Sequence, residues 1–330
     1  MDLKLSTLLC FTLLFSTILN PALSERCNPK DKKVLLQIKK AFNDPDVLSS
    51  WTPETDCCRW WFDVTCDSMN RVNSLFIYSG RLSGQIPPQV GDLPYLVDLR
   101  LHKQPDLTGP IQPSIAKLKN LMSLDLSWTN ISGSIPDFLS QLKNLTYLDL
   151  SFSNLTGSIP SSLSQLPNLG ILHLDRNKLT GPIPESFGEF HFSLISLYLS
   201  HNQLSGKIPT SLAKLDSETI DFSRNKLEGD ASMLFGLNKT TLIVDLSRNL
   251  LEFDLSKVKF PKSLFSLDLN HNKITGSIPV ELTQLDLQYL NVSYNRLCGQ
   301  IPVGGKLQSF DSSTYFHNRC LCGTPLPSCK

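Results

Sequence analysis

The stretch LDLSFSNLTGSIP, residues 148–160, decides the fold of this chain because the same pattern returns along most of the sequence. It recurs as LHLDRNKLTGPIP from Leu172, LYLSHNQLSGKIP from Leu197 and LDLNHNKITGSIP from Leu267. Ten copies begin at Leu75, Leu99, Leu124, Leu148, Leu172, Leu197, Ile220, Val244, Leu267 and Leu290. The nine intervals between them are 24, 25, 24, 24, 25, 23, 24, 23 and 23 residues. So regular a period predicts a stacked repeat architecture.

Each position of the repeat, counted from its first apolar residue, has a physical reason. Positions 1 and 3 are apolar around a polar residue, which predicts a strand with one buried face. Position 6 is Asn in the six later repeats, and its amide can satisfy backbone groups that would be costly to bury. Thr129 and Ser153 offer a hydroxyl there, whereas the first repeat has Gly80. Position 10 is Gly in eight of the ten repeats, which suits a turn, and the Ile-Pro that follows ends strand pairing.

This pattern is typical of leucine-rich repeats. It predicts an α/β repeat solenoid, a curved right-handed superhelix of ten repeats of about 24 residues, in which only stacking buries the apolar faces. Two repeats are irregular. The second has one extra residue before Leu107, which predicts a small bulge, and the eighth has Phe253 where Gly belongs and a broken apolar spacing at residues 238–240.

Composition and segment boundaries indicate one elongated, secreted domain. The 330 residues include 31 Lys and Arg against 30 Asp and Glu, so general nucleic-acid affinity is not expected. Residues 1–24 are predicted to be a signal peptide, with Lys4, a short apolar run over residues 8–19 and small residues before the cleavage site. That run is too short to span a bilayer, and no later stretch is apolar enough. An N-terminal cap is predicted over 25–70, repeats over 71–305 and a C-terminal cap over 306–330.

Cysteines cluster at the two ends of the predicted solenoid. After loss of Cys10 with the signal, the remaining eight are Cys27, Cys57, Cys58, Cys66, Cys298, Cys320, Cys322 and Cys329. An even number in an oxidising compartment predicts disulfides that stabilise both caps, although the residues alone do not fix the pairing. No histidine lies at ligand spacing, so neither a metal nor a cofactor is expected.

The N-terminal cap should contain a helix that starts at Asn28-Pro29. Its apolar face is predicted to comprise Leu35, Leu36, Ile38 and Phe42. Four aromatic residues are expected to cover the first repeat, namely Trp51, Trp60, Trp61 and Phe62.

Five Asn-x-Ser/Thr sequons predict a glycoprotein: Asn130, Asn144, Asn154, Asn238 and Asn291. Asn291 lies at position 2 on the inner face, where a glycan would crowd a partner. We therefore favour the other four.

The inner face carries the candidate binding residues. Strand alternation places positions 2 and 4 opposite the core, on the concave side. Position 2 reads Phe76, Arg100, Asp125, Asp149, His173, Tyr198, Asp221, Asp245, Asp268 and Asn291. Position 5, at the strand edge, reads Ser79, Lys103, Trp128, Phe152, Arg176, His201, Arg224, Arg248, His271 and Tyr294. Any single Asp or Arg of these columns could have a purely structural role. Taken together, an acidic column beside a basic column that also contains aromatic residues favours a protein-binding face.

An enzyme is not expected. Asp149, His173 and Asp175 could approach one another, but no Ser or Cys nucleophile is positioned by a turn and an open sheet excludes little water. Asp125 and Asp149 would lie about one strand, roughly 5 Å, apart, yet they lack a pocket that would separate their pKa values.

Four segments resemble the plant polygalacturonase-inhibiting proteins: CNPKDKKVLLQIKKAFNDP, QVGDLPYL, SxxNLTGSIP and GGKLQSFDSSTYFHNRCLCGTPLPSC. The resemblance runs from Cys27 to Lys330. It implies a secreted cell-wall glycoprotein of plant defence, which binds endopolygalacturonases of fungi and some insects on its concave face and restricts pectin cleavage. It also implies the disulfides Cys27–Cys57, Cys58–Cys66, Cys298–Cys320 and Cys322–Cys329.

The resemblance implies partner contacts on the inner strands, where Asp149, Asp175 and Asp221 match acidic positions of the family. With the neighbouring columns, the predicted partner-binding set is Asp125, Trp128, Asp149, Phe152, His173, Asp175, Arg176, Tyr198, Asp221, Arg224, Asp245, Arg248, Asp268 and His271. Because the enzyme's substrate is a polyanion, the Asp column could imitate galacturonate carboxylates, whereas the Arg column could bind pectin.

Two alternatives remain. A receptor-like, peptide-binding role would share the solenoid, but no membrane segment or cytoplasmic domain is evident. Ice binding would need a flat array of Thr or Asn, and position 4 is interrupted by charged and ring-bearing residues such as Tyr78, His102 and Asp175.

Overall fold

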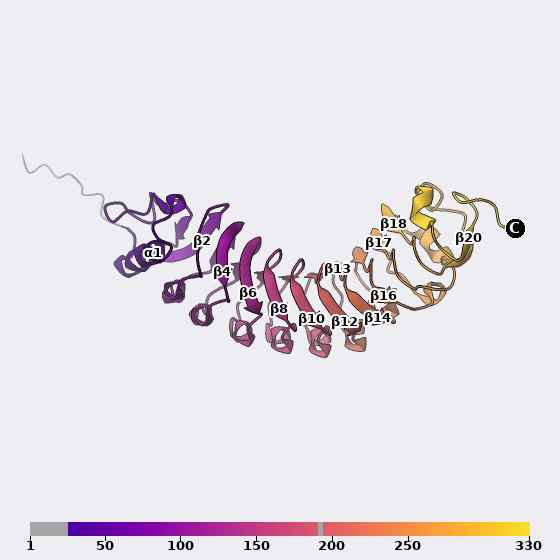
Figure 1. Ribbon diagram of the computed structural model, residues 1–330, viewed down its shortest axis with the longest axis horizontal. Helices are drawn as coiled ribbons and strands as arrows, with labels where there is room; N and C mark the ends of the chain where they lie inside the picture. The colour runs from indigo at the N-terminus through magenta and orange to yellow at the C-terminus, as the bar shows by residue number, and fades with distance from the viewer. Residues whose placement is uncertain (1–25, 191–193) are drawn as a thin grey trace, which may run out of the picture.

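The computed structural model describes residues 26–190 and 194–330, so the predicted signal peptide and Cys10 lie outside the described residues. Figure 1 shows a curved arc of stacked turns, with strands along the inner side and short helical turns along the outer side. The predicted solenoid is confirmed. No helix of the described chain is long and apolar enough to cross a membrane.

The concave side is formed by one sheet of eleven strands. They are β1 (Val64–Cys66), β2 (Val72–Tyr78), β3 (Asp98–His102), β5 (Ser123–Asp125), β7 (Tyr147–Asp149), β9 (Ile171–His173), β11 (Ser196–Tyr198), β13 (Thr219–Asp221), β15 (Ile243–Asp245), β17 (Ser266–Asp268) and β18 (Tyr289–Asn291). Strand β1 is antiparallel to β2, and the others pair in parallel so that equal repeat positions face each other, as Leu124 faces Leu148. Columns of side chains therefore run along the arc.

A second, seven-stranded sheet flanks the first and was not predicted. Its strands are β4 (Gln104–Gly109), β6 (Thr129–Ser134), β8 (Asn154–Gly157), β10 (Lys178–Gly181), β12 (Gln203–Lys207), β14 (Lys226–Gly229) and β16 (Leu250–Leu251). Most cover positions 7 to 10 of a repeat, directly before the Ile-Pro. The position-10 glycine of β8, Gly157, has a φ of 77°, which glycine adopts without steric cost.

The outer side consists of 3₁₀ turns, and α1 (Pro29–Ala41) is the only α-helix among the described residues. The 3₁₀ turns are Asp46–Leu48, Pro88–Asp92, Pro113–Lys117, Asp137–Gln141, Ser161–Gln165, Glu185–Glu189, Thr210–Lys214, Ser232–Leu234, Leu255–Lys257, Val280–Gln284 and Ser312–Tyr315. Several follow the proline of the Ile-Pro pair and bury one central leucine, such as Leu163.

The position-6 asparagines hold neighbouring turns together as predicted. The Asn177 amide nitrogen donates to the carbonyl oxygens of Leu150 (2.8 Å) and Leu174 (3.2 Å), and its Oδ1 accepts from the Leu155 backbone nitrogen (3.0 Å). The pattern repeats at Asn202, Asn225, Asn249, Asn272 and Asn295. The side chain therefore satisfies backbone groups of two successive turns.

The two irregular repeats depart from the regular turn in different ways. In the second, the pairing register shifts between Gln104 and Thr108, which is the expected bulge. Gln104 is fully buried there and takes the asparagine's role, since its Nε2 donates to the Ile77 carbonyl (3.1 Å) and its Oε1 accepts from the Leu82 nitrogen (3.2 Å). In the eighth, buried Phe253 replaces glycine after the two-residue strand β16.

The N-terminal cap is built around α1, whose first turn is capped by the Asn28 side chain. Trp51 and Trp61 are buried and stacked at 5.5 Å. The prediction is wrong for the other two aromatics, because Trp60 is 62% and Phe62 72% exposed. The cap uses the backbone of Phe62 instead, whose carbonyl accepts the indole hydrogen of Trp51.

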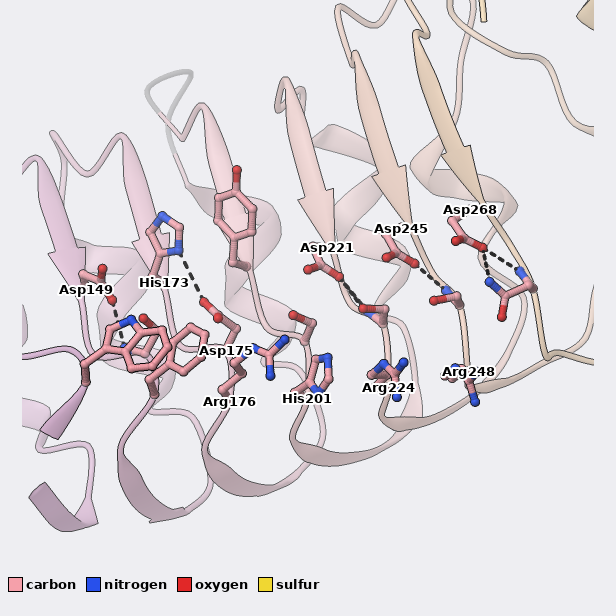
Figure 2. Close-up of a pocket in the computed structure, with 18 of the residues that line it drawn as sticks. Asp149, His173, Asp175, Arg176, His201, Asp221, Arg224, Asp245, Arg248 and Asp268 are labelled. Carbon is pink, nitrogen blue, oxygen red and sulfur yellow. Dashed lines mark hydrogen bonds and ion pairs between the residues drawn. The ribbon is translucent and has the colours of Figure 1, made fainter. Parts of the chain in front are cut away.

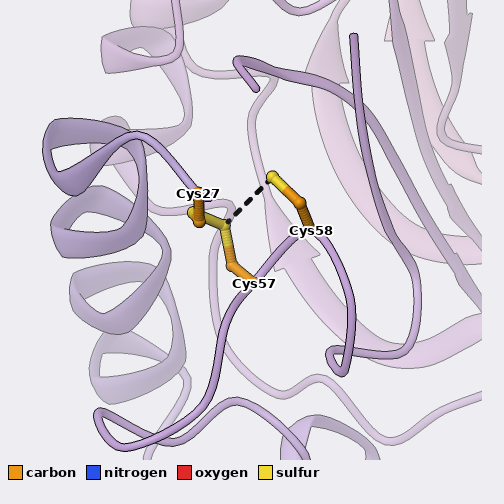
Figure 3. A group of neighbouring side chains, drawn as sticks. All are labelled: Cys27, Cys57 and Cys58. Atoms are coloured by element: carbon orange, nitrogen blue, oxygen red, sulfur yellow. Dashed lines mark hydrogen bonds between the residues drawn. A yellow bond between two sulfur atoms is a disulfide. The ribbon is translucent and has the colours of Figure 1, made fainter. Parts of the chain in front are cut away.

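All four disulfides have the pairing that the resemblance implied. Figure 3 shows three sulfur atoms that lie close together in the N-terminal cap, those of Cys27, Cys57 and Cys58, with Sγ of Cys57 and Cys58 3.9 Å apart. Cys27 is bonded to Cys57 and Cys58 to Cys66, so these sulfur atoms are not thiolates and cannot serve as a metal site. Disulfides at both caps are expected of a protein that folds in an oxidising compartment.

The ladder of turns continues into the predicted C-terminal cap. Asn318 occupies an eleventh position 6: its amide donates to the Val292 carbonyl (3.0 Å) and its Oδ1 accepts from the Leu297 nitrogen (3.0 Å). Strands β19 (Cys298–Gln300) and β20 (Cys320–Cys322) then pair in parallel. The buried ring of Tyr315 closes the apolar core, so one partial turn is added to the ten predicted repeats.

Candidate functional site

An open hollow on the concave sheet gathers most of the predicted partner-binding residues (Figure 2). It is lined by Trp128, Asp149, Ser151, Phe152, His173, Asp175, Arg176, Tyr198, Ser200, His201, Asp221, Ser223, Arg224, Asp245, Ser247, Arg248, Asp268, Asn270 and Tyr289. Of the predicted set, Asp125 and His271 do not line it. His201 and Tyr289 do, although neither was in that set.

The acidic column is fixed by hydrogen bonds within its own strands. The backbone nitrogen of Ser223, at position 4, donates to Oδ1 of Asp221, at position 2 (3.0 Å), and the Ser223 hydroxyl donates to the same oxygen (2.7 Å). Asp125 and Ser127 repeat this arrangement. Such local bonds between an Asp and the backbone two residues on are typical of turns. These bonds hold the short position-4 side chains close to the strand. Position 4 does line the concave hollow as expected, for example at Ser151, Ser200 and Ser223, but these residues are little exposed and Ser127 is fully buried.

The acids differ in what their second oxygen does. Oδ2 of Asp149 accepts from the Tyr147 hydroxyl (3.1 Å), and Oδ2 of Asp268 accepts from the Tyr289 hydroxyl (2.9 Å). Among the described residues, no hydrogen bond reaches Oδ2 of Asp221 or Asp245. These two carboxylates can therefore accept a hydrogen bond from a partner.

Three of the predicted acids have little surface that a partner could contact. Asp125, Asp149 and Asp175 are each less than a tenth exposed. His102 Nδ1 lies 3.4 Å from Oδ2 of Asp125, and His173 Nδ1 lies 3.3 Å from Oδ1 of Asp175. The repeat pattern predicted that these acids lie on the inner face. Contacts with neighbouring side chains, which the pattern did not show, decide which acids can still bind a partner.

Burial raises the pKa of three acids of the column above the ordinary value, namely Asp149, Asp245 and Asp268. Asp245 faces Asp221 and Asp268 directly in the register of β13, β15 and β17. Burial, followed by repulsion from these two carboxylates, raises the pKa of Asp245 to about 6.

The basic column has an unusual backbone. All ten position-5 residues have a φ of 51–56°, the left-handed region that L-residues with bulky side chains rarely adopt. Arg224 and Arg248 are exposed, and their guanidinium groups form no hydrogen bond or ion pair with any described residue. The Arg column therefore does not neutralise the Asp column by direct pairing, and its charges face solvent (Figure 2).

Aromatic rings occupy the upstream end of the hollow. Trp128 and Phe152 stack at 3.7 Å, and the Arg176 guanidinium lies 4.7 Å from the Phe152 ring on the next turn. Across the hollow His173 stacks on Tyr198 at 4.2 Å. The surface thus combines aromatic rings with charges of both signs, which suits recognition of a protein surface.

The hollow lacks the parts of a nucleophilic active site in the described chain. Every described cysteine is in a disulfide. The Ser223 hydroxyl donates to a carboxylate rather than to a histidine, so it is not activated as a nucleophile. The geometry fits binding better than catalysis.

The sequons lie mostly away from the hollow. Asn130, Asn144 and Asn238 are exposed, and Asn154 lies beside Asn130, with its amide nitrogen 2.6 Å from the Asn130 Oδ1. Asn291 is half-buried and accepts from Ser293. Their glycosylation remains a prediction.

Comparison with known proteins first gives the class. Residues 28–67 match the leucine rich repeat N-terminal domain, and residues 119–179, 193–215, 263–285 and 286–305 match leucine rich repeats. The chain is 76% identical to a polygalacturonase inhibitor of Pyrus communis, with 100% of each chain covered. It is 70% identical to one of Vitis vinifera, with 94% of this chain and 93% of the relative covered.

The chain belongs to the polygalacturonase inhibitor family of leucine-rich repeat proteins. The resemblance is therefore confirmed. These relatives are named as inhibitors rather than enzymes, in agreement with the predicted absence of catalysis.

Solved structures show the same fold in proteins of other functions. A plant ice-binding protein is 55% identical, with a TM-score of 0.90 over 92% of this chain and 99% of that one. The ectodomain of the Arabidopsis receptor kinase HAESA, bound to a peptide hormone, is 30% identical, with a TM-score of 0.76 over 87% of this chain and 49% of that one. The fold alone therefore does not decide the function. The function has to be inferred from the residues that line the hollow.

Proposed function

We propose that this chain is a secreted, cell-wall inhibitor that binds fungal endopolygalacturonases through its concave hollow and thereby blocks pectin cleavage. The observation that carries the proposal is the hollow itself, where unpaired Arg224 and Arg248 lie beside carboxylates with a free oxygen, in a chain of the inhibitor family. The predicted signal peptide and the disulfide-bonded caps support secretion.

Electrostatic imitation of the substrate is the proposed mechanism. An enzyme that cleaves polygalacturonate needs a basic cleft, because the substrate carries one carboxylate on each sugar. Asp221 and Asp245 lie opposite each other on adjacent strands, about 5 Å apart, and each has an oxygen free to accept from that cleft. Asp149 contributes less, because both its oxygens already accept hydrogen bonds. The curved arc then occludes the cleft sterically.

The test is the release of reducing ends from polygalacturonate by a panel of fungal endopolygalacturonases, with and without the purified protein. We expect a dose-dependent fall in the rate for at least one enzyme. The Asp221→Asn/Asp245→Asn variant should weaken that inhibition more than Asp149→Asn. Indifference of every enzyme to the wild-type protein would refute the inhibitor function, whereas unchanged inhibition by the double variant would refute only the imitation.

A second use of the surface, binding of pectin itself, is favoured by the free guanidinium groups of Arg224 and Arg248. These would retain the protein in an anionic wall. Retention on immobilised polygalacturonate should fall for Arg224→Asn/Arg248→Asn and shift little for Asp149→Asn. Equal retention of wild type and the Arg variant in rising salt would exclude this use.

A further inference from the structure

The position-5 column does not stop at the end of the hollow. His271 stacks on Tyr294 at 4.1 Å, and Tyr294 stacks in turn on His317 at 4.1 Å. Phe316 meets the His317 ring edge-on at 6.3 Å. His317 has a φ of 57°, like every other member of the column, although it belongs to the C-terminal cap. We call His271, Tyr294, Phe316 and His317 the downstream ladder.

The downstream ladder is not needed to close the solenoid. The buried Tyr315 and Leu307 do that, and the Tyr315 hydroxyl donates to the Leu307 carbonyl (2.7 Å). Tyr294 and Phe316 are each 45% exposed and His317 is also exposed. Within the described chain, neither the Tyr294 hydroxyl nor the His317 imidazole makes a hydrogen bond. Tyr294 and His317 combine an exposed ring with a left-handed backbone, and such exposed rings and strained positions are typical of an interaction surface.

The ladder is continuous with the hollow. His271 follows Asn270, which lines the hollow, and its Nδ1 lies 2.6 Å from the Asn270 Oδ1. It also follows Arg248 by one turn in the same column. Figure 1 shows that the arc curves toward its inner side at the C-terminal end, so a large body seated in the hollow would come close to the C-terminal cap.

The stacking favours a protein over a sugar as the occupant. Both faces of the Tyr294 ring are covered, one by His271 and the other by His317. A sugar ring usually packs on an open aromatic face, and here mainly ring edges are available. Edges and a free hydroxyl suit contact with apolar and polar side chains of a protein loop.

We propose that the downstream ladder is a second contact surface for the polygalacturonase, which extends the interface from the hollow onto the C-terminal cap. This inference rests on the proposed function. The complementary surface of the enzyme would be a loop with an exposed apolar or aromatic side chain. The hollow would orient the enzyme by charge, and the ladder would slow its dissociation by apolar contact.

The test compares two substitutions in one column. Tyr294→Asn/His317→Asn removes two rings while it keeps a residue that tolerates the left-handed backbone. Ser79→Asn is the matched control, because Ser79 has the same conformation, with a φ of 52°, at the opposite end of the column and outside the hollow. The measurement is the Kd for a polygalacturonase that the wild type inhibits, with thermal unfolding of each variant alongside.

We expect Kd to rise about five- to thirtyfold for the double variant and less than about twofold for Ser79→Asn. The single variant Tyr294→Phe keeps the ring and the wild-type His317, so it should retain most of the wild-type affinity. Wild-type affinity in the double variant would overturn the inference but leave the proposed function intact. Failure of the wild type to bind any polygalacturonase would remove both. A ladder that instead mediates self-association, seen as a dimer lost in the double variant, would also overturn it.

Discussion

Positions 5 and 6 are adjacent in every turn, yet in most turns position 5 is exposed or partly exposed and position 6 is buried. At position 6 a buried amide bonds to the backbone of two turns, as Asn225 does with the carbonyl of Leu199 and the nitrogen of Leu204. At position 5 the side chain faces solvent and its identity ranges from Ser to Trp. One position thus maintains the fold, and its neighbour is free to vary for recognition.

The same turn explains both. The chain must reverse sharply after the strand for the asparagine to point inward, and that reversal places the preceding residue in the left-handed region. An L-residue pays about 1–2 kcal/mol for this conformation. Arginine, tryptophan and phenylalanine at such a position are poor choices for stability, which supports a binding role for the column.

The largest effect on folding is expected from Asn225→Ala. The substitution leaves buried backbone groups of two turns without partners, which should cost about 2–4 kcal/mol. Denaturant unfolding measures it, with Arg224→Asn, one residue earlier, as the control that should change stability by less than about 0.5 kcal/mol. Equal effects of the two variants would contradict the division of roles.

A pH-dependent effect is expected from Asp245→Asn. The folded pKa of about 6 lies above the ordinary 3.8, so the folded protein holds its proton more tightly and Asp245 costs stability as pH rises from about 4 to above 6. The variant should be more stable than wild type by about 1–3 kcal/mol at pH 7 and nearly equal at pH 4. Thermal unfolding at the two pH values checks this. A constant difference between them would mean that Asp245 is not perturbed.

The smallest effect is expected from Arg224→Gly, which should raise stability. Glycine adopts the φ of 53° without steric cost, and part of that gain is offset by the greater freedom of the unfolded chain. A net gain of about 0.5–1 kcal/mol is expected, together with weaker binding. Calorimetric unfolding beside an inhibition assay tests both, and a loss of stability would show that the arginine contributes to folding.

The sequence predicted features that repeat within one turn. The period, the buried leucines, the Asn ladder and the Gly turns depend on local pattern and backbone chemistry. The second sheet was missed because its pairing depends on how successive turns align, and residues such as Asn154 carry no strand alternation. The low exposure of position 4 was missed because it depends on short side chains held against the strand, as the bonds from Ser223 to Asp221 hold Ser223.

The site was predicted as a face but not in its details. Tyr147 and Tyr289 decide which acids are engaged, and they lie just before the residues that define the repeat. Tyr289 lies opposite Ser266 in the strand register, and its hydroxyl reaches diagonally to Asp268. The eleventh turn did leave a signal, since NRCLCG from Asn318 resembles NRLCG from Asn295. The extra residue Cys320 interrupts the repeat pattern there, so this turn was not recognised.

The central claim is that the concave hollow binds the enzyme. The most direct test measures the inhibition constant of two matched double variants of the same repeat. Asp221→Asn/Arg224→Asn changes one acid and one base in the hollow, whereas Lys226→Gln/Glu228→Gln changes the same charges on β14 of the flanking sheet. The inhibition constant for a responsive polygalacturonase should rise at least about tenfold for the first variant and remain within about twofold for the second. Equal inhibition by both variants, or a loss confined to the β14 variant, would contradict the account.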